Sequence, residues 1–123
     1  MSIDITSAYQ PIVTLDGRAV VGFESLVRTC GDGPPIAPTD LLSAAREQGA
    51  TADFDWRCRL SALGGAVEAG YPDGLALFVN AEPSALDAAP PPDCLPTLAA
   101  ASHLSIIVEI TERDLMGDPA GLL

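Results

Sequence analysis

The sequence contains no lysine, and its six basic residues are all arginines. Against 17 acidic residues they leave a net charge of −11. Because a strongly anionic surface repels nucleic acids and anionic membranes, we expect neither as a partner. The same charge opposes a ligand that carries phosphate groups, unless a nearby arginine or a bound cation offsets it.

Long apolar runs and a targeting leader are also missing. No run is long enough to span a bilayer, and the N-terminus lacks the basic start and apolar stretch of a signal peptide. The three cysteines are an odd number, and their spacing does not match a metal site. These absences predict a reduced, cytoplasmic chain.

The chain is nevertheless 48% hydrophobic over 123 residues, which is enough for one domain with a real core. After a short lead (1–7), we place a hairpin at 9–28 with a two-residue turn at Asp16-Gly17. We expect helices at 39–48 and 52–69, short helices at 83–89 and 95–101, and a helix start at Thr111 and Glu112. Buried strands are expected at 75–80 and 104–110. Alternation of buried strands with helices predicts an α/β fold with a parallel sheet.

The two longer helices carry recognisable start, stop and packing signals. Thr39 is placed to cap the first helix, and Gly49 follows its last residue. In the second helix, the Gly64-Gly65 pair either weakens the helix or lets a neighbouring group approach closely. The helix should pack on the core through a stripe formed by Trp56, Leu60, Leu63 and Val67.

The second strand of the hairpin, from Val20 to Arg28, places an acid and a base together. Side chains alternate between the two faces of a strand, so Glu24 and Arg28 share one face while Ser25 lies on the other. Burying such charges costs free energy unless they are paired or bind something. They form either an ion pair at a strand end or part of a ligand site.

Two further polar residues close the buried strands. Asn80 and Glu109 end the strands at 75–80 and 104–110, and Glu24 lies near the end of its own strand. Three oxygen donors gathered at one end of a sheet suit a hard cation such as Mg²⁺, Mn²⁺ or Ca²⁺, and do not suit zinc or copper. Alternatively, Asn80 caps its own loop and Glu109 is solvated.

Several segments of the chain, in order, resemble one family. They are Tyr9–Val13 (YQPIV), Glu24–Arg28 (ESLVR), Ala45–Trp56 (AREQGATADFDW), Asn80–Pro83 (NAEP) and Val108–Glu112 (VEITE). Together they look like the N-terminal half of the EAL domain of cyclic di-GMP phosphodiesterases, with Glu-Ser-Leu in place of the signature Glu-Ala-Leu.

The resemblance implies a fold, a reaction and site residues. The family fold is a TIM-like (β/α)8 barrel, so this chain should form its first half. Glu24, Asn80 and Glu109 match the family's metal ligands, Arg28 matches an arginine that contacts a ligand phosphate, and Gln10 matches a glutamine near the ligand. There, Mg²⁺ or Mn²⁺ activates water to hydrolyse cyclic di-GMP to linear pGpG.

The departures from the family pattern qualify this expectation. The family's later ligands, a paired Asp and a Lys among them, have no counterpart in residues 1–123, which we expect to be a partial domain truncated after its fourth strand. Arg46 also stands where the family usually has Glu. We therefore expect no hydrolysis by this chain alone, and self-association or a protein partner at the open barrel edge, 104–110. The alternatives are a non-catalytic module that binds cyclic di-GMP or a protein, and an unrelated α/β domain with a coincidental acid cluster.

Overall fold

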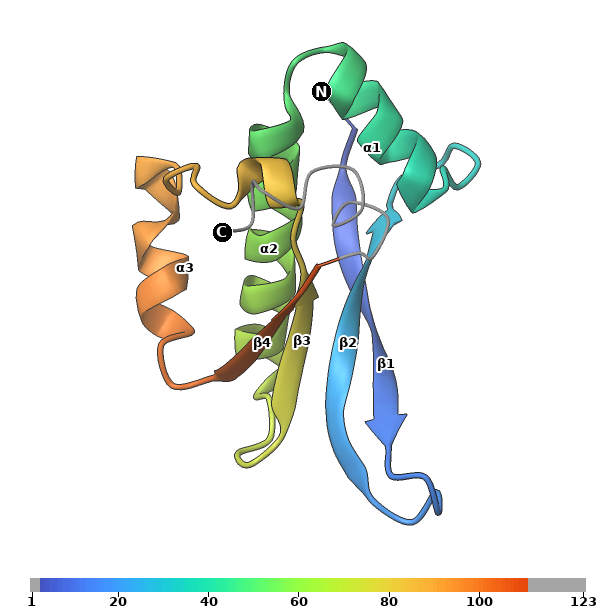
Figure 1. Cartoon of the computed structure of the whole chain (residues 1–123), viewed down its shortest axis with the longest axis vertical. Helices are drawn as coiled ribbons and strands as arrows, with labels where there is room; N and C mark the ends of the chain where they lie inside the picture. The colour runs from blue at the N-terminus through green and yellow to red at the C-terminus, as the bar shows by residue number, and fades with distance from the viewer. Residues whose placement is uncertain (1–2, 111–123) are drawn as a thin grey trace.

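The computed structural model describes residues 3–110, which form four strands and three α-helices (Figure 1). The strands are β1 (Ile5–Val13), β2 (Val20–Thr29), β3 (Ala76–Asn80) and β4 (Ser105–Glu109). The helices are α1 (Pro38–Glu47), α2 (Thr51–Ala69) and α3 (Leu95–Ala100), with short 3₁₀ turns η1 (Pro83–Ala85) and η2 (Pro92–Cys94). The helix start expected at Thr111 and Glu112 lies outside the described residues.

The strands form a single sheet in the order β1-β2-β3-β4. β1 and β2 pair antiparallel as a hairpin, whereas β2, β3 and β4 run parallel. Parallel neighbours need a crossover connection, and here α1 with α2 and then α3 supply it. The predicted α/β fold, a hairpin followed by βα units, is confirmed.

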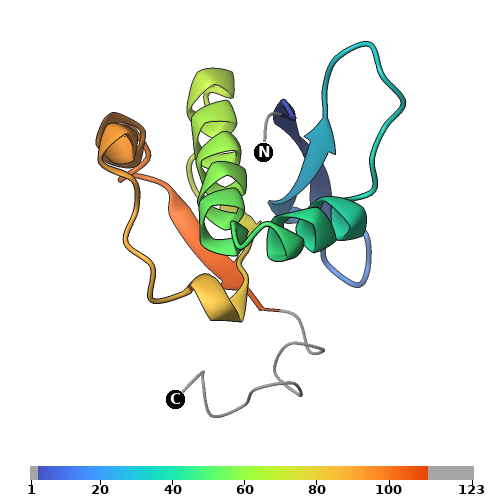
Figure 2. The same cartoon turned by 90° about the horizontal axis from the view of Figure 1, so that it is seen from above.

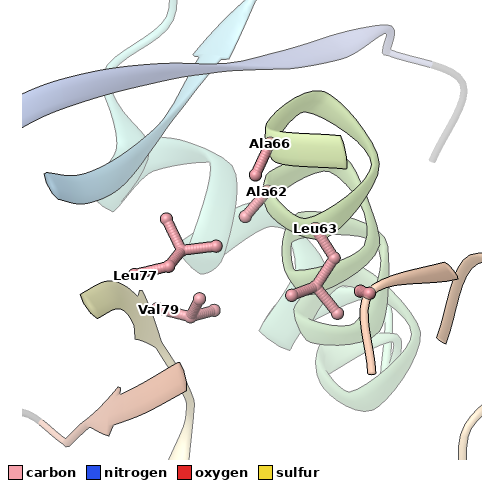
Figure 3. Packing of buried hydrophobic residues seen from close by; sticks show 6 residues of the cluster. Ala62, Leu63, Ala66, Leu77 and Val79 are labelled. Atoms are coloured by element: carbon pink, nitrogen blue, oxygen red, sulfur yellow. The ribbon is translucent and has the colours of Figure 1, made fainter. Parts of the chain in front are cut away.

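The main core lies between α2 and β3 (Figure 3). Leu77 and Val79 of β3 are buried against Ala62, Leu63 and Ala66 of α2. Small alanine side chains let the helix backbone come close to the sheet, so the buried side of α2 is centred on them. The predicted stripe is therefore wrong in part: its Leu63 is buried, while the other three members are half-buried on the flanks.

A glycine in α2 lets the hairpin come equally close. The Tyr9 hydroxyl of β1 donates a hydrogen bond to the Ala62 carbonyl oxygen at 2.8 Å. A Cβ atom on Gly65 would overlap the Tyr9 hydroxyl oxygen, whereas one on Gly64 would meet only Thr97 Cγ2, at 3.9 Å. The sequence left two roles open for this glycine pair, and Gly65 takes the role of permitting a close approach.

A smaller cluster fixes α1 on the same side of the sheet. Leu41 and Ala45 of α1 are buried with Phe54 of α2, and Val27 of β2 packs against them. Seen from above, α2 lies between the hairpin and α3 (Figure 2). Helices α1 and α2 therefore pack on the face of the sheet that carries Val27, Leu77 and Val79.

Some expected boundaries are wrong for local reasons. The hairpin connection spans residues 14–19, because Thr14 bonds Ala19 and Gly17 through its backbone and Asp16 through its hydroxyl; only Gly17 has positive φ there. β1 begins at Ile5, inside the expected lead. Helix α1 begins at Pro38 with Ala37 as its N-cap, so Thr39 does not cap it. A proline at the first helical position already has a suitable φ and no N–H to satisfy.

Two other expectations can be settled in the described residues. The short helix expected at 83–89 is one 3₁₀ turn, Pro83–Ala85, whereas Gly49 does take positive φ just after α1. Within residues 3–110, no helix is both long and apolar enough to cross a membrane.

Candidate cation site

Side chains alternate between the two faces of each strand. We call the sheet face opposite to α1 and α2 the open face. Leu77 and Val79 point to α2, so Phe78 and Asn80 of β3 lie on the open face. Ser25 is buried on the helix side, where its hydroxyl donates to the Phe78 carbonyl oxygen at 3.2 Å. Glu24 therefore lies on the open face, as the alternation predicted.

The register of the strands brings the predicted donors together. Asn80 of β3 and Glu109 of β4 are direct partners in the ladder, and Glu24 of β2 pairs with Phe78, two residues before Asn80. Glu24 lies near the middle of β2, which continues to Thr29, and not near its end as expected. The offset still places its side chain beside those of β3 and β4.

Glu24 and Glu109 form a pair of facing carboxyl groups. The pKa of Glu109 is raised above its usual value, first by burial and then by Glu24, whose carboxyl group lies within hydrogen-bonding reach and whose negative charge repels it. Two ionised carboxylates can only accept hydrogen bonds, so neither satisfies the other. Among the described residues, Glu109 Oε1 is a buried atom without a hydrogen-bond partner.

Asn80 completes this group with an amide. Its Nδ2 atom donates a long hydrogen bond of 3.5 Å to the Ser25 carbonyl oxygen of β2. This contact spans the two parallel strands and directs the amide toward β2. Asn80 is exposed, so its side-chain oxygen is accessible to a ligand on the open face.

Gln10 and Arg28 lie at the margin of the site. Gln10 is exposed and pairs with Glu24 across the hairpin, so the two side chains share a face. Arg28 is exposed and donates from a guanidinium nitrogen to the Val27 carbonyl oxygen at 2.8 Å. Within residues 3–110, Glu24 and Arg28 make no ion pair, so the alternative of a closed Glu/Arg pair is not supported.

The donor set fits a hard divalent cation, and it is incomplete. Within the described part of the chain, no group of three or more His, Cys, Asp or Glu side chains is placed to hold a metal ion. The gathered donors are two carboxylates and one amide, which are oxygen ligands of the kind that Mg²⁺, Mn²⁺ and Ca²⁺ take. The buried, unpaired carboxylate oxygen is the feature that a cation would satisfy.

Two residues that shape this region were not among those predicted from the sequence. Gly22 lies on the open face, where a Cβ atom would overlap the Ala76 carbonyl oxygen and lie 3.0 Å from the Phe78 ring. A glycine inside a strand is a signal for such close approach. Asp55 of α2 is buried and binds the backbone after β3; its pairing with Arg59 four residues later was the available signal.

Comparison with known proteins identifies the family. The EAL domain matches residues 3–122. Comparison with curated proteins gave no match. Among solved structures, a manganese and cyclic di-GMP complex of Klebsiella pneumoniae BlrP1 is 26% identical with a TM-score of 0.64, and the match covers 95% of this chain and 30% of that one.

Two further structures agree. Bacillus subtilis YkuI, with an EAL domain, in complex with cyclic di-GMP and calcium is 25% identical with a TM-score of 0.67, covering 97% of this chain and 31% of that one. A standalone EAL protein from Vibrio cholerae O395, bound to cyclic di-GMP, is 27% identical with a TM-score of 0.64, and the match covers 92% of this chain and 48% of that one. The chain thus spans less than half of each of these structures.

The hairpin followed by parallel βα units defines the class as a TIM-like barrel domain of which these residues form a part. The chain belongs to the EAL-domain family, and its 123 residues correspond to about half of such a domain.

Proposed function

We propose that Glu24, Asn80 and Glu109 form part of a divalent-cation site that binds cyclic di-GMP, as a partial phosphodiesterase-type EAL domain. The main support for this proposal is the buried Glu109 Oε1 atom. It has no hydrogen-bond donor among the described residues, and its carboxyl group faces Glu24. A cation at this point neutralises both acids and gives that oxygen a partner. Complexes with manganese or calcium and cyclic di-GMP among the similar structures support this choice.

Each residue has a role in this proposal. The cation, Mg²⁺ or Mn²⁺ when bound, polarises the phosphodiester and lowers the pKa of a coordinated water. Arg28 exchanges its bond to the Val27 carbonyl for a ligand phosphate, which is a charge-assisted and stronger acceptor. Gln10, across from Glu24, donates its amide N–H to the ligand.

We further propose that this chain by itself binds cyclic di-GMP and does not hydrolyse it. A two-cation centre needs ligands that hold both ions and the attacking water. The gathered donors of the described residues are two carboxylates and an amide, which is a small set even for one ion. We therefore expect a weakly held cation and no product.

Calorimetric titration with cyclic di-GMP in Mn²⁺, together with chromatography for pGpG, tests this proposal. We expect binding that Glu24→Gln and Arg28→Ala weaken and that Glu47→Gln, on the exposed surface of α1, leaves unchanged. The absence of binding by the unaltered chain contradicts the proposed ligand. Formation of pGpG that Glu24→Gln abolishes contradicts the proposed lack of turnover.

A second candidate function, a protein-interaction module, is favoured by β4. Three consecutive side chains of this strand, the last one in residues 3–110, are exposed over both faces: Ile106 by 41%, Ile107 by 43% and Val108 by 51%. An apolar edge strand offers unpaired backbone groups to another strand. We propose that β4 pairs with a second copy of the chain, and more strongly at high salt, which screens the charge of −11.

Sedimentation velocity across protein and salt concentrations tests the pairing. Val108→Lys places a charge on the β4 edge and should yield a monomer, whereas Leu15→Lys, in the hairpin connection and outside the strands, serves as a matched control. A monomer at every concentration of the unaltered chain contradicts the module.

A further inference from the structure

Residues 80–82, the last residue of β3 and the two that follow it, make hydrogen bonds to three neighbouring elements. The Asn80 amide reaches the Ser25 carbonyl of β2, and the Ala81 N–H donates to the Glu109 carbonyl oxygen of β4 at 2.9 Å. The third bond comes from outside the sheet, where the Glu82 N–H donates to Asp55 Oδ1 of α2 at 2.9 Å. The three bonds tie this segment to both neighbouring strands and to the main helix.

Asp55 is an unusual residue for its position. Its exposed fraction is only 5%, and an ionised carboxylate at such a place is costly without partners. Arg59 supplies the countercharge, because its Nε donates to Asp55 Oδ2 at 2.8 Å and a terminal nitrogen adds a second bond to the same oxygen. The centre of the Trp56 ring lies 4.4 Å from the Arg59 guanidinium carbon, and this cation–π contact helps to hold the arginine.

The two carboxylate oxygens of Asp55 bind different partners. Oδ2 takes the bonds from the arginine of its own helix, and Oδ1 accepts the backbone N–H of the segment after β3. The Glu82 side chain, 12% exposed, also pairs with Arg46 of α1 at 2.9 Å. Glu82 is thereby anchored to α2 through its backbone and to α1 through its side chain.

The segment borders a cavity, so the hydrogen bonds that hold it can affect its position. A cavity of about 230 Å³ lies between the helices and the sheet, and Asp55, Asn80, Ala81 and Glu82 all contribute to its lining. Without the bond to Asp55, the segment has room to move toward the cavity. Asn80 is the first residue of the segment and the ladder partner of Glu109, so the place of its side chain depends on how firmly the segment is held.

We propose that Asp55 is a positioning residue for the cation site. Its Oδ1 atom fixes the backbone of residues 80–82 and so sets the Asn80 side chain beside Glu109. The proposal rests on the proposed function, since it takes Asn80 as a cation ligand. Outer groups that orient the ligands of a metal site change its affinity by about 10- to 100-fold when they are altered.

The test weakens the one hydrogen bond in one variant and deletes it in another. Asp55→Asn keeps the shape but removes the charge that strengthens the bond. Glu82→Pro deletes the donor N–H, and the Glu82 backbone has φ −80° and ψ 125°, which proline accepts even before Pro83. Glu82→Ala is the matched control, because it loses the same carboxylate and keeps the N–H. Trp56→Phe is a control for stability, because it removes the 3.1 Å bond to the Ala88 carbonyl but keeps an aromatic ring beside Arg59 and leaves Asp55 in place.

Two readouts separate positioning from simple destabilisation. In a titration followed by Mn²⁺ electron paramagnetic resonance, Asp55→Asn and Glu82→Pro should weaken binding about tenfold, and Glu82→Ala and Trp56→Phe less than twofold. Amide exchange by NMR without metal should show the Ala81 N–H exchanging about tenfold faster in the same two variants, relative to Glu82→Ala, as expected for the loss of one hydrogen bond.

The exchange measurement distinguishes the failure of this inference from the failure of the proposed function. If Ala81 exchanges at the unaltered rate in folded Asp55→Asn and Glu82→Pro, Asp55 does not position the segment. If exchange accelerates while Mn²⁺ affinity stays the same, Asp55 fixes the backbone but not a cation ligand, and the inference is overturned. If the unaltered chain binds no Mn²⁺, the proposed function fails, and with it the assignment of Asn80 as the ligand that Asp55 positions.

Discussion

Replacing Glu109 with glutamine should stabilise the metal-free chain. Glu109 Oε1 is buried without a donor among the described residues, and the Glu24 carboxylate repels the ionised side chain. A buried polar atom left without a partner costs about 1–3 kcal/mol. The amide of glutamine keeps the shape, removes one charge and can donate to Glu24, so we expect a gain of about 1–2 kcal/mol.

The gain should depend on pH in a defined direction. The pKa of Glu109 is raised in the folded chain above its usual 4.5, so the folded state binds its proton more tightly than the unfolded state does. Stability contributed in this way is fully present below the unfolded pKa and is lost as pH rises through the folded pKa. The advantage of Glu109→Gln should therefore be greatest at neutral pH and shrink as pH falls toward 4.5.

Urea unfolding in EDTA, followed by the fluorescence of Trp56, measures this difference. At an m-value of about 1.5 kcal/mol/M, the expected gain raises the midpoint by about 1 M at pH 7.5. Asp73→Asn, which removes an exposed carboxylate in the loop before β3, is the control for net charge and should shift little. A Glu109→Gln chain that is less stable at pH 7.5, or a difference that stays constant down to pH 5, would refute the reasoning.

Three other outcomes follow from contacts elsewhere in the chain. Gly65→Ala should lower stability by about 1–3 kcal/mol, because its methyl group overlaps the Tyr9 hydroxyl. Gly64→Ala should be neutral or gain up to about 1 kcal/mol. Equal urea midpoints for the two variants would contradict this difference. Cys30 is exposed and should react with a thiol reagent at pH 8, while burial raises the pKa of Cys58 to about 12, so it should react only on unfolding; equal rates contradict this. Tyr9→Phe should lose about 1 kcal/mol of stability through its bond to Ala62, and an unchanged midpoint would show that this bond contributes nothing.

The sequence predicted the faces of the strands better than the turns between them. Alternation along β2 separates Glu24 from Ser25 correctly, because the two-residue period holds wherever one face is packed against helices. The Asp16-Gly17 signal placed the hairpin connection correctly and misjudged its length. The hydrogen bonds that Thr14 makes extend the connection to residues 14–19. The turn propensities of Asp16 and Gly17 do not predict these bonds.

The site shows the same division between local and long-range information. Strand-end positions and the parallel register were enough to place Asn80 beside Glu109. The role of Asp55 could not be read from the sequence, because its acceptor oxygen binds a backbone N–H 27 residues away. A helical Asp–Arg pair of this spacing is commonly an exposed ion pair, and only the packed fold makes it an internal one.

The most direct test of the account is the affinity of the chain for Mn²⁺, measured by electron paramagnetic resonance at pH 7.5. We predict that the unaltered chain binds the ion, that Glu109→Gln weakens binding by at least about tenfold, and that Asp73→Asn binds as the unaltered chain does. Equal affinity of Glu109→Gln and the unaltered chain would contradict the claim that Glu109 and its neighbours hold a cation.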